Sequence, residues 1–301
     1  MKKPPTSNKS LVLLTLFFVT LLARMFEVTA QEKPQSGTND VVLIEKAEGW
    51  TLSKSSSGSV VFEGRLIDGA VEAMISYFKG VDDANLRLTL SSGGGVTLPS
   101  IRLGRFIREH NISIHINNIC GSACAYFILP AAPDVSFSKH AIIGLHHAPT
   151  EKYLKRLEMV LNSEKFKNNS ATTDKQRLKV AQLIERTRKE LRTINDFYSE
   201  LGLPEEVLLS VTNLESAAKK ILANDNVSAN IRNKVLIVPD QTFLKHCLGF
   251  NIPAWKGVSK QGVKILTKKI KYPILALSEG NFIYKNELIK ESGDQNCFLP
   301  K

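Results

Sequence analysis

Two short apolar runs, separated by one helix length of chain, constrain the fold of this sequence more than any other feature. In Leu86–Leu90 and again in Ile112–Ile116, every second residue is leucine or isoleucine. This period of two predicts strands with one face in a core. Between them, the apolar residues after Pro99 follow helical spacing, with arginines left for solvent. A strand, a helix and a second strand predict a parallel βαβ unit.

The same pattern extends to both sides of these runs. Before them, a strand is predicted at Val60–Phe62 and a helix starting near Asp68, whose apolar residues Val71, Met74, Ile75 and Phe78 follow i, i+3, i+4 and i+7 spacing. After them, a buried helix is predicted at Ala123–Leu129, ended by Pro130. Strands are predicted at Val135–Phe137 and Ala141–Leu145. Ligand sites in parallel units gather at the carboxyl ends of strands. The glycines Gly93–Gly95, Ser122 and His146 occupy such positions, so we expect a site there.

The first thirty residues have the layout of a signal peptide. Three lysines precede the apolar stretch Leu11–Ala23, and small residues up to Ala30 suit cleavage. The stretch is shorter than the roughly 20 residues that span a membrane, so residues 1–30 are predicted to be removed on export to the periplasm. An uncleaved N-terminal membrane tether is the alternative. Residues 31–58 are rich in polar residues, Ser and Gly and are predicted to form a flexible leader.

Charge does not favour a nucleic-acid ligand. The chain has 40 Lys and Arg against 29 Asp and Glu, a net charge of +11. Loss of residues 1–30 removes four basic residues and one acidic residue and leaves +8. Such an excess draws a protein toward anionic surfaces without identifying a ligand, and the sequence has no arginine-rich block. We expect no nucleic-acid partner, no cofactor and no metal.

The four cysteines are Cys120, Cys124, Cys247 and Cys297. Exported proteins usually meet oxidising conditions, so one or two disulfides are expected. Spacing does not determine the pairing. For Cys120 and Cys124, buried thiols that pack as small apolar side chains are an equal alternative.

The chain changes character after residue 150. Residues 59–150 contain the βαβ pattern, residues 151–234 form a basic extension predicted to be helical, with a solvated loop at Asn162–Asp174, and residues 235–301 form a mixed portion that completes the domain. A broken apolar stripe that includes Ile184, Leu191, Ile194 and Tyr198 either packs on a partner or covers the protein's own core. The mixed portion has predicted strands at Val235–Val238, Ile270–Ala276 and Phe282–Tyr284.

Ser122 has the sequence context of a nucleophile. It lies between a predicted strand and a predicted helix, so its hydroxyl would lie near the positive end of a helix dipole. A serine needs a base within hydrogen-bond reach, and His146, with His147 as the fallback, follows a parallel strand. Its imidazole can accept the proton and return it to the leaving group. In the alternatives, Ser122 only caps a helix, or His140 joins the two histidines in a zinc site, for which no H-E-x-x-H pattern is present.

The glycine run supplies a third requirement, which is stabilisation of an oxyanion. Backbone N–H groups usually provide it, and a chain without side chains can approach a substrate closely. We expect the N–H groups of Gly94 and Ala123 to be the two donors. The alternative is a simple strand-to-helix turn. The run lacks the GK[ST] tail of a P-loop and the GxGxxG spacing of a dinucleotide fold.

Three motifs together resemble a known family. They are Leu-Thr-Leu-Ser-Ser-Gly-Gly-Gly-Val, Cys-Gly-Ser-Ala-Cys-Ala and Gly-Leu-His-His-Ala-Pro. In order and spacing they are similar to the ClpP/crotonase superfamily, above all to the proteolytic subunit of Clp proteases and its periplasmic relatives, from Val60 to about Pro149. The resemblance implies a repeated ββα (βαβ) superhelix with a parallel sheet, extended here by a helical and mixed C-terminal part. It also implies Ser122 as nucleophile, His146 as base with His147 as fallback, and Gly94 and Ala123 as oxyanion donors.

The family's third triad member, an aspartate, has no clear counterpart. Counting back from a match at Pro239 reaches Asn233, and Asp225 is the nearest carboxylate. A lysine base after His147, as in some related peptidases, is a further alternative.

The resemblance implies an ATP-independent serine peptidase that acts on peptides or unfolded proteins. We expect no ATPase partner, because an exported protein has no obvious ATP supply, and homo-oligomers occur among related proteins. Two alternatives stay open. One is a non-catalytic binding protein that has lost the third triad member. The other is acyl-CoA chemistry, which export disfavours because CoA is cytosolic.

Overall fold

The structure is a computed structural model. It describes residues 41–56, 58–81, 86–146, 150–167, 173–204, 207–232, 235–258, 273–278, 281–284, 287–289 and 297. They belong to the second of two compact units, Asp40–Lys301. The predictions for residues 1–30, His147 and Asn233 therefore lie outside the described residues. Within the described ranges, no helix combines the length and apolarity needed to cross a membrane.

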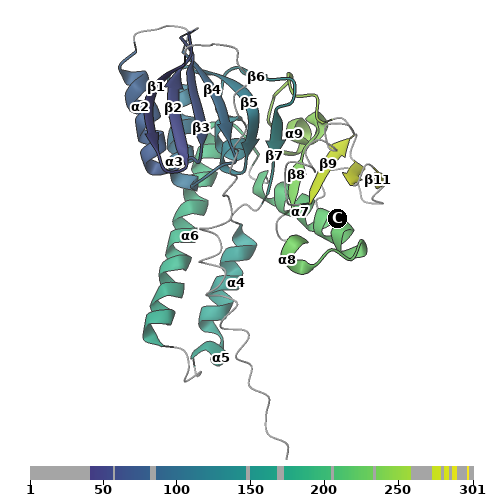
Figure 1. The fold of residues 1–301 in the computed structure, drawn as a ribbon. Coiled ribbons are helices and arrows are strands. Elements are labelled where there is room, and N and C mark those ends of the chain that lie inside the picture. Colours follow the sequence, from purple (N-terminus) through teal and green to yellow (C-terminus); the bar gives the residue numbers. More distant parts are fainter. Residues whose placement is uncertain are drawn as a thin grey trace, which may run out of the picture. The chain divides into compact units, whose positions relative to one another are not determined.

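The larger sheet has seven strands (Figure 1). They run in the order β1 (Val42–Ala47), β2 (Trp50–Lys54), β3 (Val60–Gly64), β4 (Arg87–Ser92), β5 (Ser113–Gly121) and β6 (Val135–Phe137), and β7 (Ile142–Gly144) also pairs with β5. The pairs from β3 to β6 and the β5–β7 pair are parallel, whereas β1–β2 and β2–β3 are antiparallel. The protein is therefore α/β with a mostly parallel sheet, as the alternating runs predict.

The core follows the predicted periodicities. Leu88 and Leu90 on β4 are fully buried, and the isoleucines of β5 beside them are at most 1% exposed. Helix α2 (Asp68–Lys79) buries all four residues of its predicted apolar face. Helix α3 (Thr97–Glu109) carries Pro99 in its first turn and packs on α2. These predictions are confirmed.

The N-terminal hairpin corrects one prediction. Residues 42–54, expected to belong to a flexible leader, form β1 and β2, and β2 pairs along its whole length with β3. Trp50 and Leu52 are buried, and the Trp50 ring stacks on Phe62 with 6.3 Å between centroids. Local sequence does not reveal this hairpin, because β1 is almost entirely exposed and β2 offers only two core residues. Its burial comes from pairing with β3.

Residues 151–232 are largely helical, as predicted. The helices are α4 (Glu151–Asn162), α5 (Glu164–Lys167), α6 (Asp174–Glu200), α7 (Val207–Asn224) and α8 (Ala229–Arg232). The short helix α5 lies inside the predicted solvated loop at Asn162–Asp174, so that prediction is wrong for these four residues. Helices α4 and α6 lie side by side (Figure 1), and Arg188 on α6 donates to Glu158 on α4 at 2.7 Å.

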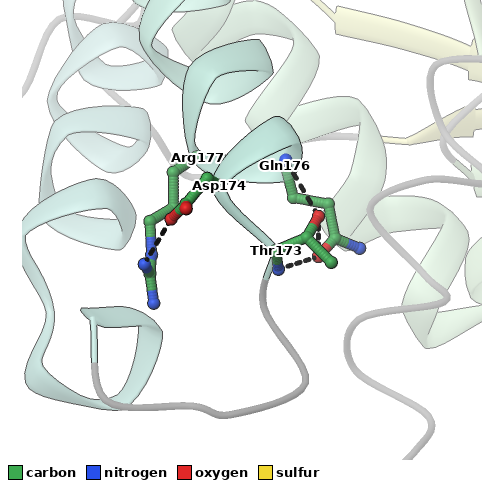
Figure 2. A network of polar contacts seen from close by, with 4 residues as sticks. All are labelled: Thr173, Asp174, Gln176 and Arg177. Atoms are coloured by element: carbon green, nitrogen blue, oxygen red, sulfur yellow. Dashed lines mark hydrogen bonds and ion pairs between the residues drawn. The ribbon is translucent and has the colours of Figure 1, made fainter.

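A capping box sets the start of α6 (Figure 2). The Thr173 hydroxyl accepts a hydrogen bond from the Gln176 N–H at 3.3 Å, while the Thr173 N–H donates to Gln176 Oε1 at 2.8 Å. Asp174 and Arg177 form an ion pair at 2.9 Å on the same turn. The box satisfies two N–H groups that a helix start otherwise leaves open.

The apolar stripe of α6 covers the protein's own core. Ile184, Leu191 and Ile194 are buried, and the rings of Phe197 and Tyr198 each lie 6.1 Å from the Phe127 ring. Of the two alternatives that the sequence leaves open, the structure favours this one for the C-terminal half of the helix.

The C-terminal part contains a second, four-stranded sheet. Its strands run in the order β11 (Glu287–Ile289), β10 (Asn281–Tyr284), β9 (Ile274–Ser278) and β8 (Leu236–Val238), with α9 (Gln241–Cys247) after β8. A disulfide joins Cys247 to Cys297. Leu145 and Ile237 exchange two backbone hydrogen bonds, at 2.7 and 2.9 Å. This bridge brings β8 alongside the end of β7, next to His146.

His115 on β5 lies between two serine hydroxyls. Its Nδ1 is 2.9 Å from Ser136 Oγ, and its Nε2 is 3.0 Å from Ser138 Oγ. The Ser138 hydroxyl donates to Asn117 Oδ1 at 3.1 Å and the Ser136 hydroxyl to the Ile114 carbonyl at 3.5 Å, so the imidazole belongs to a network that includes both serines. Burial, and then the positive charge of Arg87, lower the pKa of His115.

This lowered pKa predicts a loss of stability in mild acid. The unfolded chain protonates His115 near pH ~6.5, whereas the folded chain resists protonation. The contribution of His115 to stability is therefore complete above that pH and is lost as the pH falls toward the lower folded-state pKa. His115→Gln, whose amide can still bond both serines, should flatten the difference between urea denaturations at about pH 7.5 and about pH 5.5. An unchanged difference in the variant would contradict this.

Candidate active site

Ser122 lies at the carboxyl end of β5, directly after Gly121. There Gly121 pairs with Gly144 of β7, and the Ser122 N–H donates to the Gly144 carbonyl at 2.8 Å. Ser122 has a φ of +50°, in the left-handed region that residues other than glycine rarely adopt. A residue held in this region costs roughly 1–3 kcal/mol, and such residues cluster at functional sites. The fold therefore imposes on Ser122 a conformation that serine does not favour by itself.

A disulfide closes the turn around Ser122. It joins Cys120 in β5 to Cys124, and both residues are fully buried. A loop this short gains little stability from closure entropy, so the bond acts locally and restricts the turn that carries Ser122. Of the two alternatives that the sequence leaves open for Cys120 and Cys124, the structure has the disulfide and not two buried thiols.

The predicted buried helix after Ser122 is a single π-helical turn, η1 (Cys124–Ile128). All five of its residues are buried, and Pro130 follows soon after, as expected. The Leu129 N–H donates to the Cys124 carbonyl five residues earlier, at 3.3 Å. Single π turns are rare and occur often at functional sites. A period-based prediction cannot separate one such turn from an α-helix.

Gly94 approaches the Ser122 turn closely. A Cβ on Gly94 would lie 2.6 Å from the Ser122 Cβ, 2.7 Å from the Gly121 carbonyl oxygen and 3.0 Å from the Ala123 nitrogen. Gly94 also has a φ of +105°. The fold therefore brings together Gly94, Ser122 and Ala123, three of the residues expected at the site.

The Gly94 N–H is already hydrogen-bonded in this structure. It donates to Ser92 Oγ at 3.1 Å, and Ser92 is 1% exposed. The expectation that Gly94 donates to an oxyanion therefore requires this contact to open. Sequence reasoning did not single out Ser92, although a serine two residues before a turning glycine can bond its backbone.

His146 follows the end of β7 and is half-buried, with its Nε2 shielded from solvent. The hydroxyl of Tyr126, on η1, donates to the His146 carbonyl at 2.9 Å and accepts from the His146 N–H at 3.1 Å. Sequence reasoning missed Tyr126, because nothing local links a tyrosine to a backbone twenty residues away.

Tyr126 lies in an electrostatically unusual position. Burial, followed by the negative charge of Glu215 and then by Tyr198, raises its pKa well above the ordinary value, and the bond to His146 opposes this only in part. Glu215 is 7% exposed and pairs with Lys219 at 2.7 Å on the same helix, α7. Helical spacing from the buried Val211 and Leu222 would have placed this carboxylate on the inner face.

Of the two expected third members, Asp225 is exposed, directly after α7, and Asn233 lies outside the described residues. Over the ranges that the structure describes, no group of three or more His, Cys, Asp or Glu side chains is arranged to hold a metal. No family model matches the sequence, and no curated protein matches it.

The close approach of Gly94 gives a stability prediction. Gly94→Ala should lower the free energy of unfolding by about 2–5 kcal/mol, because a side chain at positive φ costs about 1–2 kcal/mol and an overpacked contact about 1–3 kcal/mol. Gly93→Ala is the matched control, since nothing lies within 4 Å of a Cβ there. It should change stability by only about 0.5 kcal/mol. Urea denaturation measures both, and equal losses would contradict the close packing of Gly94 against Ser122.

Proposed function

We propose that this protein is an exported, ATP-independent hydrolase of the serine-peptidase type. Ser122 is the nucleophile, His146 the base, and the N–H groups of Ala123 and Gly94 the oxyanion donors. The observation that carries the proposal is the left-handed conformation of Ser122 at a strand end, with Gly94 packed against Ser122 and against the Ala123 nitrogen. A fold that maintains this strain at a serine supports a role for its hydroxyl.

The proposed reaction is acyl transfer through these groups. Ser122 Oγ forms a bond to the substrate carbonyl carbon while its proton passes to His146, and the carbonyl electrons move to oxygen. The Ala123 N–H stabilises that oxygen, joined by Gly94 if its bond to Ser92 opens. Breakage of the peptide C–N bond releases an amine, which takes the proton from His146. Water then attacks the acyl carbon while its proton passes to His146, and breakage of the bond between Ser122 Oγ and that carbon releases the acid as the proton returns to Oγ.

We also propose that the fold is a ClpP/crotonase-like superhelix. The parallel strands β3, β4, β5 and β7 and the positions of the three motifs at their carboxyl ends support a ClpP/crotonase-like superhelix. Two disulfides support an oxidising compartment such as the periplasm, where no ATP-driven unfoldase is expected. We therefore propose peptides or unfolded proteins as substrates.

A non-catalytic binding protein is the second candidate. The Gly94 N–H bond to Ser92 favours it, because this bond occupies one of the two expected oxyanion donors. Such a protein would keep the Ser122 turn without an activated hydroxyl.

Covalent labelling separates the two candidates. The purified protein, with both disulfides intact, is treated with a fluorophosphonate probe, and the adduct is located by peptide mass spectrometry. A hydrolase should carry one adduct, on Ser122, and should lose labelling on unfolding in urea. A folded protein that stays unlabelled, or is labelled elsewhere, would favour the binding protein.

A further inference from the structure

One residue, Tyr126, contacts both halves of the candidate site. Its backbone N–H donates to the Ser122 carbonyl at 3.0 Å. Its hydroxyl exchanges two hydrogen bonds with the backbone of His146, at 2.9 and 3.1 Å. Tyr126 is only 3% exposed, so the turn of the nucleophile and the main chain of the base are joined through one buried side chain.

We infer that Tyr126 is a positioning residue, which fixes the His146 main chain relative to Ser122 and so sets the direction from which the imidazole reaches the serine hydroxyl. The inference rests on the proposed function, because the relative position of the two groups matters only if they react together. Tyr126 touches no reacting atom and acts through His146.

The Tyr126 hydroxyl suits this role because it bonds both backbone polar groups of His146, the N–H and the carbonyl. A phenol can donate to the carbonyl and accept from the N–H at once, and no purely apolar side chain satisfies either group. The raised pKa keeps the proton on the hydroxyl over the pH range in which proteins work, so both bonds persist.

The ring and backbone of Tyr126 are themselves held in place. Its ring meets that of Phe127 edge-on at 6.1 Å, and its backbone N–H is bonded to the Ser122 carbonyl at 3.0 Å. The disulfide between Cys120 and Cys124 restrains the preceding turn. A displacement of His146 relative to Ser122 would therefore require the hydroxyl bonds themselves to break.

Tyr126→Phe removes the hydroxyl and leaves the packed ring. Tyr198→Phe is the matched control, because Tyr198 is equally buried and its hydroxyl bonds Tyr126 without bonding His146. The rate of fluorophosphonate labelling is measured across pH for the oxidised full-length wild type and both variants, where circular dichroism shows them folded. We expect Tyr126→Phe to slow labelling by roughly 100-fold, the cost of about 1 Å of misplacement, and to shift the pH of half-maximal labelling. Tyr198→Phe should behave as the wild type does.

The outcomes separate this inference from the proposed function. An unlabelled wild type would overturn both. A labelled wild type with an unchanged rate and pH profile in Tyr126→Phe would overturn the role of Tyr126 and leave the hydrolase standing. Equal slowing in Tyr126→Phe and Tyr198→Phe would also overturn it, since general packing would then explain the effect.

A second measurement applies if Tyr126→Phe does not fold. The adduct on Ser122 introduces a bulky, polar phosphonate ester into the candidate site, and a resulting change at His146 should reach Tyr126 through its two bonds. In wild-type protein isotopically labelled at tyrosine and histidine, the Tyr126 ring resonances should shift together with the His146 amide when Ser122 reacts with the fluorophosphonate. A shift confined to His146 would overturn the inference.

Discussion

Ser122→Ala is expected to abolish fluorophosphonate labelling and reduce peptide hydrolysis by roughly 10⁴- to 10⁶-fold, the range found when a catalytic serine is removed. The hydroxyl supplies the atom that forms the new bond, so no neighbouring group replaces it. Folding should persist, because alanine experiences the same left-handed backbone as serine at φ +50°. Circular dichroism and urea denaturation check the fold, and labelling with hydrolysis checks the chemistry.

Ser122→Gly sharpens this result. Glycine also lacks the hydroxyl, but it adopts positive φ without the steric penalty of a Cβ. We expect Ser122→Gly to be inactive and more stable than Ser122→Ala by about 0.5–1 kcal/mol, after allowing for the greater freedom of glycine in the unfolded chain. An inactive glycine variant that is more stable than the alanine variant would show that the strained position is kept for the reaction of the serine hydroxyl.

Ser100→Ala serves as the control for loss of a buried hydroxyl. Ser100 lies on α3 and is fully buried, and its hydroxyl donates to the Val96 carbonyl at 2.8 Å. Its variant should keep wild-type labelling. Equal labelling of wild type and Ser122→Ala would contradict the nucleophile assignment.

His146→Gln is expected to have the second largest effect, a loss of labelling rate of roughly 10³- to 10⁴-fold. Glutamine can occupy similar space and keep the two backbone bonds to Tyr126, but it cannot accept the serine proton. Without a base, reaction depends on the small ionised fraction of the hydroxyl. The rate in the variant should therefore rise about tenfold per pH unit in alkali, while the wild-type rate levels off.

His140→Gln is the control for this substitution, because His140 is exposed in the turn before β7. It should label at the wild-type rate. If His146→Gln labels normally and His147→Gln does not, the base is the fallback histidine. If neither variant slows labelling, a histidine base is contradicted.

The elements that could be predicted from sequence are those whose signals are local. The strands β4 and β5 and the apolar face of α2 can be predicted, because burial of one face makes apolar residues recur with a period of two in a strand and of 3.6 in a helix. The sequence predicts a leader for residues 42–54, which is wrong because the order of this hairpin derives from pairing with β3 and not from its own pattern. The π-helical turn after Ser122 was likewise predicted only as a buried helix.

For the candidate site, the sequence indicates which residues take part, and the tertiary structure determines how those residues contact one another. Strand ends and motif spacing alone pointed to Gly94, Ser122, Ala123 and His146, because parallel strands carry their carboxyl ends to one edge of the sheet. Only the folded chain shows that Ser92 holds the Gly94 N–H, that a disulfide brackets Ser122, and that Tyr126 bonds the backbone of His146. Backbone angles and hydrogen bonds between distant segments arise when the sheet brings those segments together, and no local periodicity of the sequence encodes them.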